Sequence, residues 1–306
     1  MNTTADEPRS LPPHAVIAAT DFSVGADLAV QRAARLAREQ ACPLALLHVL
    51  SQDWLSTLQQ WLGNRPPVEH LIADVQAALQ READALVAEV PQGVHACVVA
   101  GHPVQTLARW AGEGAARCLV LGARGQGGVQ RLLLGTTAER LLRKAQCPVL
   151  VVRQSAAQPY QRVLVPVDFS PWSAPTLALV DTMAPHALVE LLHVYTVPFE
   201  EKLRFAGVDD DTIAHYRERT RAQAHARLLA LAHEQGWPPS RYRVHLREGD
   251  AAPAVVRSAQ EWGCDLVALG KHGQGVAEEL LLGSVTKHVV AEAACDVLVS
   301  PAAQRV

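Results

Sequence analysis

The chain has 306 residues, of which 49% are hydrophobic and 19% are charged, and its formal net charge is −3. This length suits two domains of ordinary size, with enough apolar material for two cores. So small a net charge gives no electrostatic reason to expect nucleic acid or an anionic membrane as a partner. The polar, acidic start and the lack of an apolar run of ~20 residues predict a cytoplasmic protein without a membrane span.

The six cysteines form no C-x-x-C pair and no cluster with metal-ligand spacing. Their scatter predicts buried free thiols in a reducing compartment rather than disulfides or a metal centre.

Short apolar runs alternate with amphipathic segments along the first half of the chain. They predict strands at 14–20, 43–49, 94–100, 117–121 and 148–152, and helices at 26–40, 71–90, 103–111 and 136–145. Ser23 is the expected N-cap of the first helix. An apolar stripe from Trp54 to Leu62 predicts a short amphipathic segment, which we expect to pack on its own domain more readily than on a protein partner.

The second half repeats this order. It predicts strands at 163–167, 188–195, 241–247, 265–269 and 297–300, and helices at 174–184, 209–235, 253–262 and 284–293. Alternating strands and helices are typical of a parallel sheet covered on both faces, the doubly wound or Rossmann-like α/β class. We therefore expect a disordered tail at 1–13, a domain at 14–153, a linker at 154–160 and a second domain at 161–301.

One glycine pattern, G-x2-G-x9-G-[ST], occurs between a predicted strand and a predicted helix in each half. The first copy is Gly122, Gly125 and Gly135-Thr136, and the second is Gly270, Gly273 and Gly283-Ser284. Glycine lets an anion approach the backbone, and a helix N-terminus offers free N–H groups to a phosphate. The alternatives are that the glycines only serve turns, and that Thr136 and Glu139 form a capping box.

Together with the turns AATDFS and VPVDFS and the strands LALLHVL and VELLHVY, this pattern resembles the universal stress protein family in its tandem, ATP-binding form. The resemblance implies the strand order 3-2-1-4-5 in each domain. It implies bound ATP, AMP or ADP, with or without magnesium. It also implies pairing of the fifth strands, Pro148–Val152 with Val297–Ser300, in an intramolecular pseudo-dimer, with further homodimerisation left open.

Carried over by position, the resemblance implies two nucleotide sites. They consist of Asp21, Val49, Gly122, Arg124, Gly125, Gly135, Thr136 and Thr137, and of Asp168, Val194, Gly270, His272, Gly273, Gly283, Ser284 and Val285. The aspartates would contact the nucleoside, the valines adenine, and the glycines with Thr136 and Ser284 the phosphates. The alternatives are an Asx turn for each aspartate and ordinary strand core for each valine.

The resemblance implies a stress-response protein that responds to bound nucleotide as a switch. A slow ATPase or phosphotransferase and a scaffold without ligand are the alternatives; no catalytic residues are assignable, so an enzyme is the less favoured reading. Because Glu278 and Glu279 stand where the first half has Gln130 and Arg131, we expect the first site to bind at least as tightly. An unidentified protein partner remains open.

Overall fold

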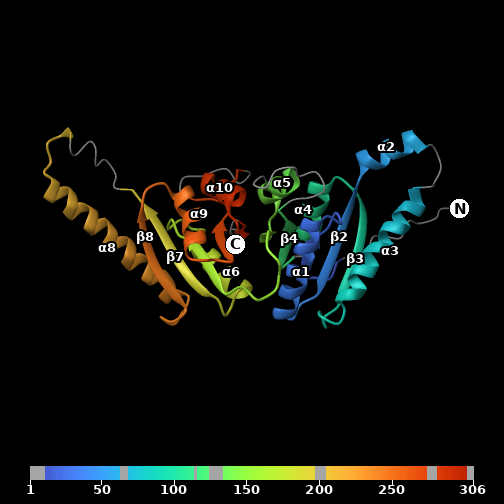
Figure 1. Cartoon of the computed structure of the whole chain (residues 1–306), viewed down its shortest axis with the longest axis horizontal. Helices are drawn as coiled ribbons and strands as arrows, with labels where there is room; N and C mark the ends of the chain where they lie inside the picture. Colours follow the sequence, from blue (N-terminus) through green and yellow to red (C-terminus); the bar gives the residue numbers. More distant parts are fainter. Residues whose placement is uncertain are drawn as a thin grey trace. The chain divides into compact units, whose positions relative to one another are not determined.

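The computed structural model describes residues 11–62, 68–113, 116–123, 134–196, 205–273 and 281–301, with backbone alone for 58–62 and 68–69. The chain divides into two compact units, Met1–Pro159 and Tyr160–Val306. Each unit is an α/β domain with one parallel sheet (Figure 1).

The first unit has the strand order β3-β2-β1-β4-β5. Its elements are β1 (Val16–Ala19), α1 (Val24–Glu39), β2 (Leu44–Ser51), α2 (Gln52–Leu62), α3 (Val68–Leu86), β3 (Val94–Gly101), α4 (Pro103–Glu113), β4 (Cys118–Gly122), α5 (Thr136–Lys144) and β5 (Val149–Val152).

The second unit has the matching order β10-β9-β6-β7-β8. Its elements are β6 (Arg162–Pro166), α6 (Ser173–Met183), β7 (Leu188–Tyr195), α8 (Asp210–Glu234), β8 (Tyr242–Glu248), α9 (Ala251–Glu261), β9 (Leu266–Gly270), α10 (Ser284–Glu292) and β10 (Asp296–Ser300). The predicted fold class and the 3-2-1-4-5 order are confirmed in both halves.

The central strands are buried along almost their whole length, as expected for a sheet covered on both faces. The right-handed crossovers that parallel strands require put α1 and α3 on one face of the first sheet and α4 and α5 on the other. Consistent with this, α4 contacts α5 in the first unit, and α9 contacts α10 in the second. Side chains cap the beginning of two helices: Ser23 is the N-cap of α1, as predicted, and Asp209 is the N-cap of α8.

Two segments differ from the sequence-based prediction. Residues 52–62, expected to be only a short amphipathic segment, form the full helix α2, in which Trp54 is 44% exposed. The tail prediction lies mostly outside the described residues, but Leu11 at its end is buried.

Two arginines of α1 hold the middle of the predicted linker. The Arg32 guanidinium donates to the Gln158 carbonyl at 2.9 Å, and the Arg35 Nε donates to the Ala156 carbonyl at 2.8 Å. Residues 156–158 are thus fastened to α1 rather than free in solvent.

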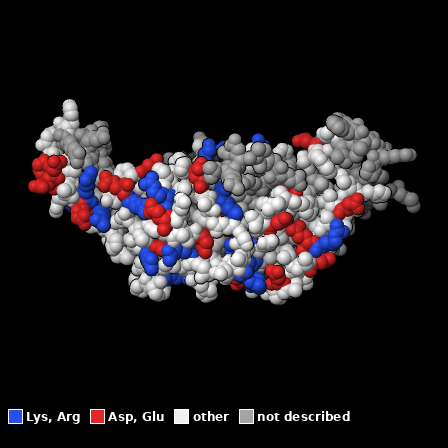
Figure 2. Space-filling view, viewed as in Figure 1, with Lys and Arg blue, Asp and Glu red and all other residues white. Residues whose placement is uncertain are grey.

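All six cysteines are free; five of them are buried, as the sequence predicted, whereas Cys97 is only half-buried. Burial raises the pKa of the Cys147 thiol to about 11 and that of Cys264 to about 12, so both are neutral at physiological pH. On the face of the molecule shown in Figure 2, acidic and basic side chains of the described residues are interspersed.

Candidate functional site

The strand order reverses beside the first strand of each unit. In the first unit β1 pairs with both β2 and β4, with Val16 opposite Leu44 and Cys118; in the second, β6 pairs with β7 and β9. In open α/β sheets, ligands bind beyond the carboxyl ends of the strands at such a reversal. The turns after β1 and β6 lie at this edge, as do Gly122 at the end of β4 and Gly270 at the end of β9.

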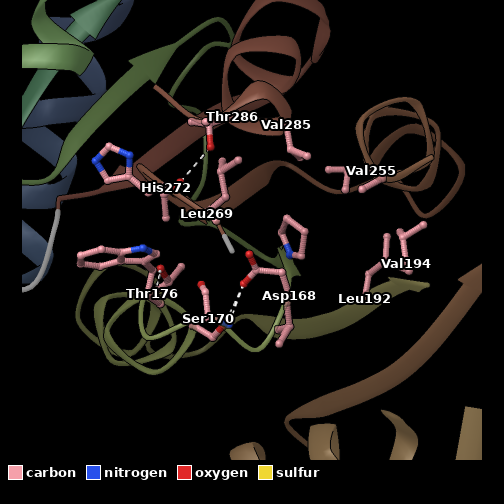
Figure 3. A pocket seen from close by; sticks show the side chains of 18 of the residues that line it. Asp168, Ser170, Thr176, Leu192, Val194, Val255, Leu269, His272, Val285 and Thr286 are labelled. Atoms are coloured by element: carbon pink, nitrogen blue, oxygen red, sulfur yellow. Dashed lines mark hydrogen bonds between the residues drawn. The ribbon is translucent and has the colours of Figure 1, made fainter. Parts of the chain in front are cut away.

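The second unit has a pocket of about 200 Å³ at this edge (Figure 3). The pocket is lined by all eight residues that the sequence assigned to the second site: Asp168, Val194, Gly270, His272, Gly273, Gly283, Ser284 and Val285. These residues come from β7, the turn after β6, the loop after β9 and the start of α10. The fold therefore brings together residues spread over more than a third of the chain.

A carboxylate and two serines form one wall of this pocket. The Oδ1 atom of Asp168 accepts a hydrogen bond from the Ser170 N–H at 2.9 Å and from the Ser173 hydroxyl at 3.3 Å. In the first unit, Asp21 Oδ1 accepts from the Ser23 N–H at 3.1 Å. Both aspartates therefore form the Asx turn that was the alternative to ligand binding, and this role uses one oxygen of each carboxylate.

A phenylalanine with left-handed backbone follows each aspartate. Phe22 has φ 58° and Phe169 has φ 60°, a conformation that costs non-glycine residues energy. The centre of the Phe169 ring lies 4.5 Å from that of the His193 ring and 3.8 Å from the Arg227 guanidinium carbon. Packing on both partners holds the strained turn in place.

His193 and its counterpart His48 join the second strand of each sheet to the first. His193 Nδ1 donates to the Val167 carbonyl at 2.7 Å, and His48 Nδ1 donates to the Thr20 carbonyl at 2.8 Å. Burial is the main cause that lowers the pKa of His193, and the nearby Arg227 lowers it further. His193 is therefore a neutral, hydrogen-bonded strand residue near pH 7.

The glycines of the pattern are required for different reasons. A Cβ on Gly122 would lie 2.5 Å from the Gly25 carbonyl oxygen, and one on Gly270 would lie 2.8 Å from the Trp172 Cβ. A Cβ on Gly273 would instead lie 2.7 Å from Asp168 Oδ2, inside the pocket. The first glycine of each copy thus leaves room for the beginning of α1 or for Trp172 at the beginning of α6, whereas Gly273 leaves room for the carboxylate.

The third glycine of each copy begins a helix. Gly135 and Gly283 are the N-caps of α5 and α10, and no side chain of a described residue caps either helix. Glu139 pairs with Arg143 at 2.6 Å, so the capping box expected as an alternative for Thr136 does not form. Thr136 and Ser284 are exposed at the first helical positions. The N-terminus of α10 therefore presents backbone N–H groups at the pocket's rim, where an anion is favoured.

Two long matches of the sequence to known proteins agree with this geometry. Residues 13–153 and 159–301 each match the universal stress protein family. The chain belongs to the universal stress protein family. It is 29% identical to the universal stress protein Rv2005c of Mycobacterium tuberculosis, with 94% of this chain and 97% of that one aligned. A second relative, Rv2623 of the same organism, is also 29% identical over 93% and 95% of the two chains.

Solved structures of the family share the tandem fold. A universal stress protein from Archaeoglobus fulgidus superposes with a TM-score of 0.61 at 18% identity, covering 95% of this chain and 99% of that chain. A protein described as a putative universal stress protein from Pseudomonas aeruginosa has a TM-score of 0.59 at 18% identity, covering 94% and 93%. At these identities the likeness concerns the fold alone.

Sequence reasoning missed several residues of the second universal stress protein domain. The pocket is also lined by Pro166, Val167, Ser170, Trp172, Ser173, Thr176, Leu192, Ala251, Val255, Leu269 and Thr286. Ser170 and Ser173 could have been identified as near neighbours of Asp168 in the sequence. Thr286 could have been identified because it lies in the first turn of the helix after the glycine loop. Trp172 had no comparable signal. Its ring lies 5.7 Å from that of His272, which is 5% exposed.

Figure 3 shows His272 and Val194 at opposite ends of the lining residues. Val194 lies half-buried near the end of β7, as Val49 lies near the end of β2. If Val194 contacts a base, His272 is therefore at the far end of the site from it.

In the first domain the structure places Asp21, Val49, Gly122, Gly135, Thr136 and Thr137 at the same edge of the sheet, at the ends of β1, β2 and β4 and the start of α5. Arg124 and Gly125 lie outside the described residues. The described residues contain no group of three or more histidine, cysteine or acidic side chains that could hold a metal ion. Among them, no helix is long and apolar enough to cross a membrane.

Proposed function

We propose that this protein binds an adenine nucleotide, ATP in the first instance, in the pocket of its second domain, and that it acts as a nucleotide-responsive switch in a cytoplasmic stress response. The observation that carries the proposal is the assembly of all eight residues of the second predicted site around one pocket. The first domain, which repeats the same turn and glycine pattern, is the second proposed site.

The pocket suits the two ends of a nucleotide. Leu192, Val194 and Val255 provide an apolar wall for a base, and Asp168 provides a carboxylate that accepts hydrogen bonds from an amino group or a sugar hydroxyl. The start of α10 at Gly283 and Ser284 provides N–H groups and a helix dipole for phosphate. A magnesium ion, if used, would arrive with the phosphates.

The first test is mass spectrometry of small molecules released from the purified, denatured protein, followed by calorimetric titration with ATP. We expect adenine nucleotide to be released, or to bind when added. A protein that is purified without nucleotide and gives no heat with ATP would contradict the proposal and favour a scaffold role.

The pocket itself is tested with Gly273→Val, because a side chain at this position displaces the Asp168 carboxylate. We expect loss of the second domain's binding, while Gly112→Val on α4, which has open space around the glycine, serves as a control in the first domain. The corresponding Gly125→Val tests the first site, so the two variants also decide which site binds more tightly. ATP turnover that Gly273→Val abolishes would instead indicate an enzyme.

A further inference from the structure

The Ser170 side chain is buried in the pocket of the second domain with its hydrogen-bonding capacity unused. Ser170 is 7% exposed and lines the pocket. Among the described residues, its Oγ has no hydrogen-bond partner. Buried polar atoms are almost always paired, and an unpaired hydroxyl destabilises the fold. This hydroxyl therefore needs an explanation.

The matching serine of the first domain shows what Ser170 does not do. Ser23 is the N-cap of α1, and its Oγ accepts a hydrogen bond from the Ala26 N–H at 3.3 Å. In the second domain α6 begins only at Ser173, and its N-cap is Trp172. The backbone carbonyl of Ser170, rather than its side chain, accepts from the Ser173 N–H at 3.1 Å. The later helix start has released the Ser170 hydroxyl from capping.

The position of this hydroxyl is held by its neighbours. The Ser170 N–H donates to Asp168 Oδ1 at 2.9 Å, as the dashed line in Figure 3 shows, and the Ser173 hydroxyl donates to the same oxygen at 3.3 Å. The preceding residue, Phe169, packs against both His193 and Arg227. A polar group held this way before a ligand arrives loses little entropy on binding.

The neighbouring charge decides which part of a nucleotide can reach Ser170. The Asp168 carboxylate would repel a phosphate, whereas the start of α10 across the pocket favours one. We propose that the Ser170 hydroxyl forms a hydrogen bond with the nucleoside part of the ligand, its sugar or base. Ser23 instead caps α1 with its oxygen, so we infer that it makes no matching contact in the first domain. This inference rests on the proposed function and extends it to a difference between the two sites.

Calorimetric titrations with ATP and with adenosine test the contact, using the full-length chain. The binding heat that Gly273→Val removes defines the second site. For this component we expect Ser170→Ala to weaken the affinity for ATP and the affinity for adenosine by the same factor, about tenfold. Ser23→Ala is the matched control, and it leaves this component unchanged.

Thermal unfolding without ligand separates a binding role from a structural one. Ser170→Ala removes an unpaired hydroxyl, so its Tm equals or exceeds that of the unaltered protein. Ser23→Ala removes a helix cap, so its Tm falls by about 2–4 °C. A fall in Tm for Ser170→Ala as large as that for Ser23→Ala would overturn the inference, because it would reveal a structural partner.

The titrations distinguish failure of this inference from failure of the proposed function. If Ser170→Ala binds both ligands normally while Gly273→Val loses the second site, the Ser170 contact is wrong and the nucleotide site stands. A loss confined to ATP also overturns the inference, because the contact would then be to phosphate. If the unaltered protein binds neither ligand, both proposals fail.

Discussion

The turns after β1 and β6 carry the same three residue types and yet begin their helices differently. In the first domain α1 starts directly after Ser23, and its backbone passes so close to β4 that Gly122 can carry no side chain. In the second domain α6 starts three residues after Ser170, and the Trp172 Cβ takes the place next to Gly270. A shared motif can therefore preserve a loop's shape while assigning its polar atoms to different tasks.

The largest expected effect comes from the packing against the first glycine of each pattern. Gly122→Ala places a methyl group 2.5 Å from a backbone oxygen, so we expect it to destabilise the protein by about 3 kcal/mol. Gly270→Ala places a methyl group 2.8 Å from the Trp172 Cβ, and we expect it to destabilise the protein by about 1–2 kcal/mol. Urea unfolding of each variant gives the difference in the free energy of unfolding.

Gly112→Ala on α4 is the control for this pair. Apart from its chain neighbours and the backbone of α4 itself, no atom lies within 4 Å of the added methyl group, so better helix propensity should stabilise the protein by up to about 1 kcal/mol. If Gly122→Ala were as well tolerated as Gly112→Ala, the close approach of α1 to β4 would be wrong.

A second difference between the domains concerns the helices α4 and α9. Asp250 caps α9 through a hydrogen bond from the Ala252 N–H at 3.2 Å, whereas the exposed His102 precedes α4. Asp250→Ala should lower the free energy of unfolding by about 1 kcal/mol. His102→Asp should stabilise the first domain by a similar or smaller amount. Thermal unfolding at neutral pH measures both, and shifts of the same sign would contradict the comparison.

The contact between Arg227 and Phe169 is expected to have a smaller effect. Arg227→Ala removes the cation–π contact and should cost about 0.5–1 kcal/mol. Because the Arg227 charge lowers the pKa of His193, the same change should raise that pKa. NMR titration of the His193 ring measures the shift, and Arg227→Gln, which also lacks the charge, should reproduce it; an unchanged pKa would contradict the contact.

The smallest expected effect is a pH dependence. The pKa of His193 is lowered from its ordinary value of 6.5, chiefly by burial. As the pH falls below 6.5, the unfolded chain takes up a proton at this residue before the folded chain does. Stability should therefore fall from pH 6.5 down to the folded-state pKa, and be fully present above pH 6.5. His193→Asn should show a weaker decline over this range in urea unfolding at successive pH values; an unchanged decline would show that other groups cause it.

Sequence periodicity was sufficient for the strands, most helices and the doubled α/β architecture, because buried parallel strands and amphipathic helices have strong local signals. The eight residues of the second site came from the resemblance, and the strand order brings them to one pocket. The roles of Ser170 and Trp172 could not be predicted in this way. They depend on where α6 begins, and the shared Asp-Phe-Ser motif does not fix that position, because α1 begins directly after Ser23 whereas α6 begins at Ser173.

The glycines show the same limit. Their spacing was evident in the sequence. Why glycine is needed at each position depends on close contacts between segments far apart in the chain, such as Gly122 and Gly25.

The expected pairing of the two fifth strands and the tighter binding at the first site stay predictions.

Because the glycines have different structural roles, they should be lost at different rates when a duplicated domain changes its function. A domain that no longer binds a ligand still has to pack the helix after its first strand against its fourth strand, so Gly122 or Gly270 would be retained. Gly273, which lies beside the carboxylate, is not constrained by this packing once the pocket no longer binds a ligand. Substitution of the second glycine with retention of the first would therefore indicate a domain that no longer binds a ligand and has only a structural role.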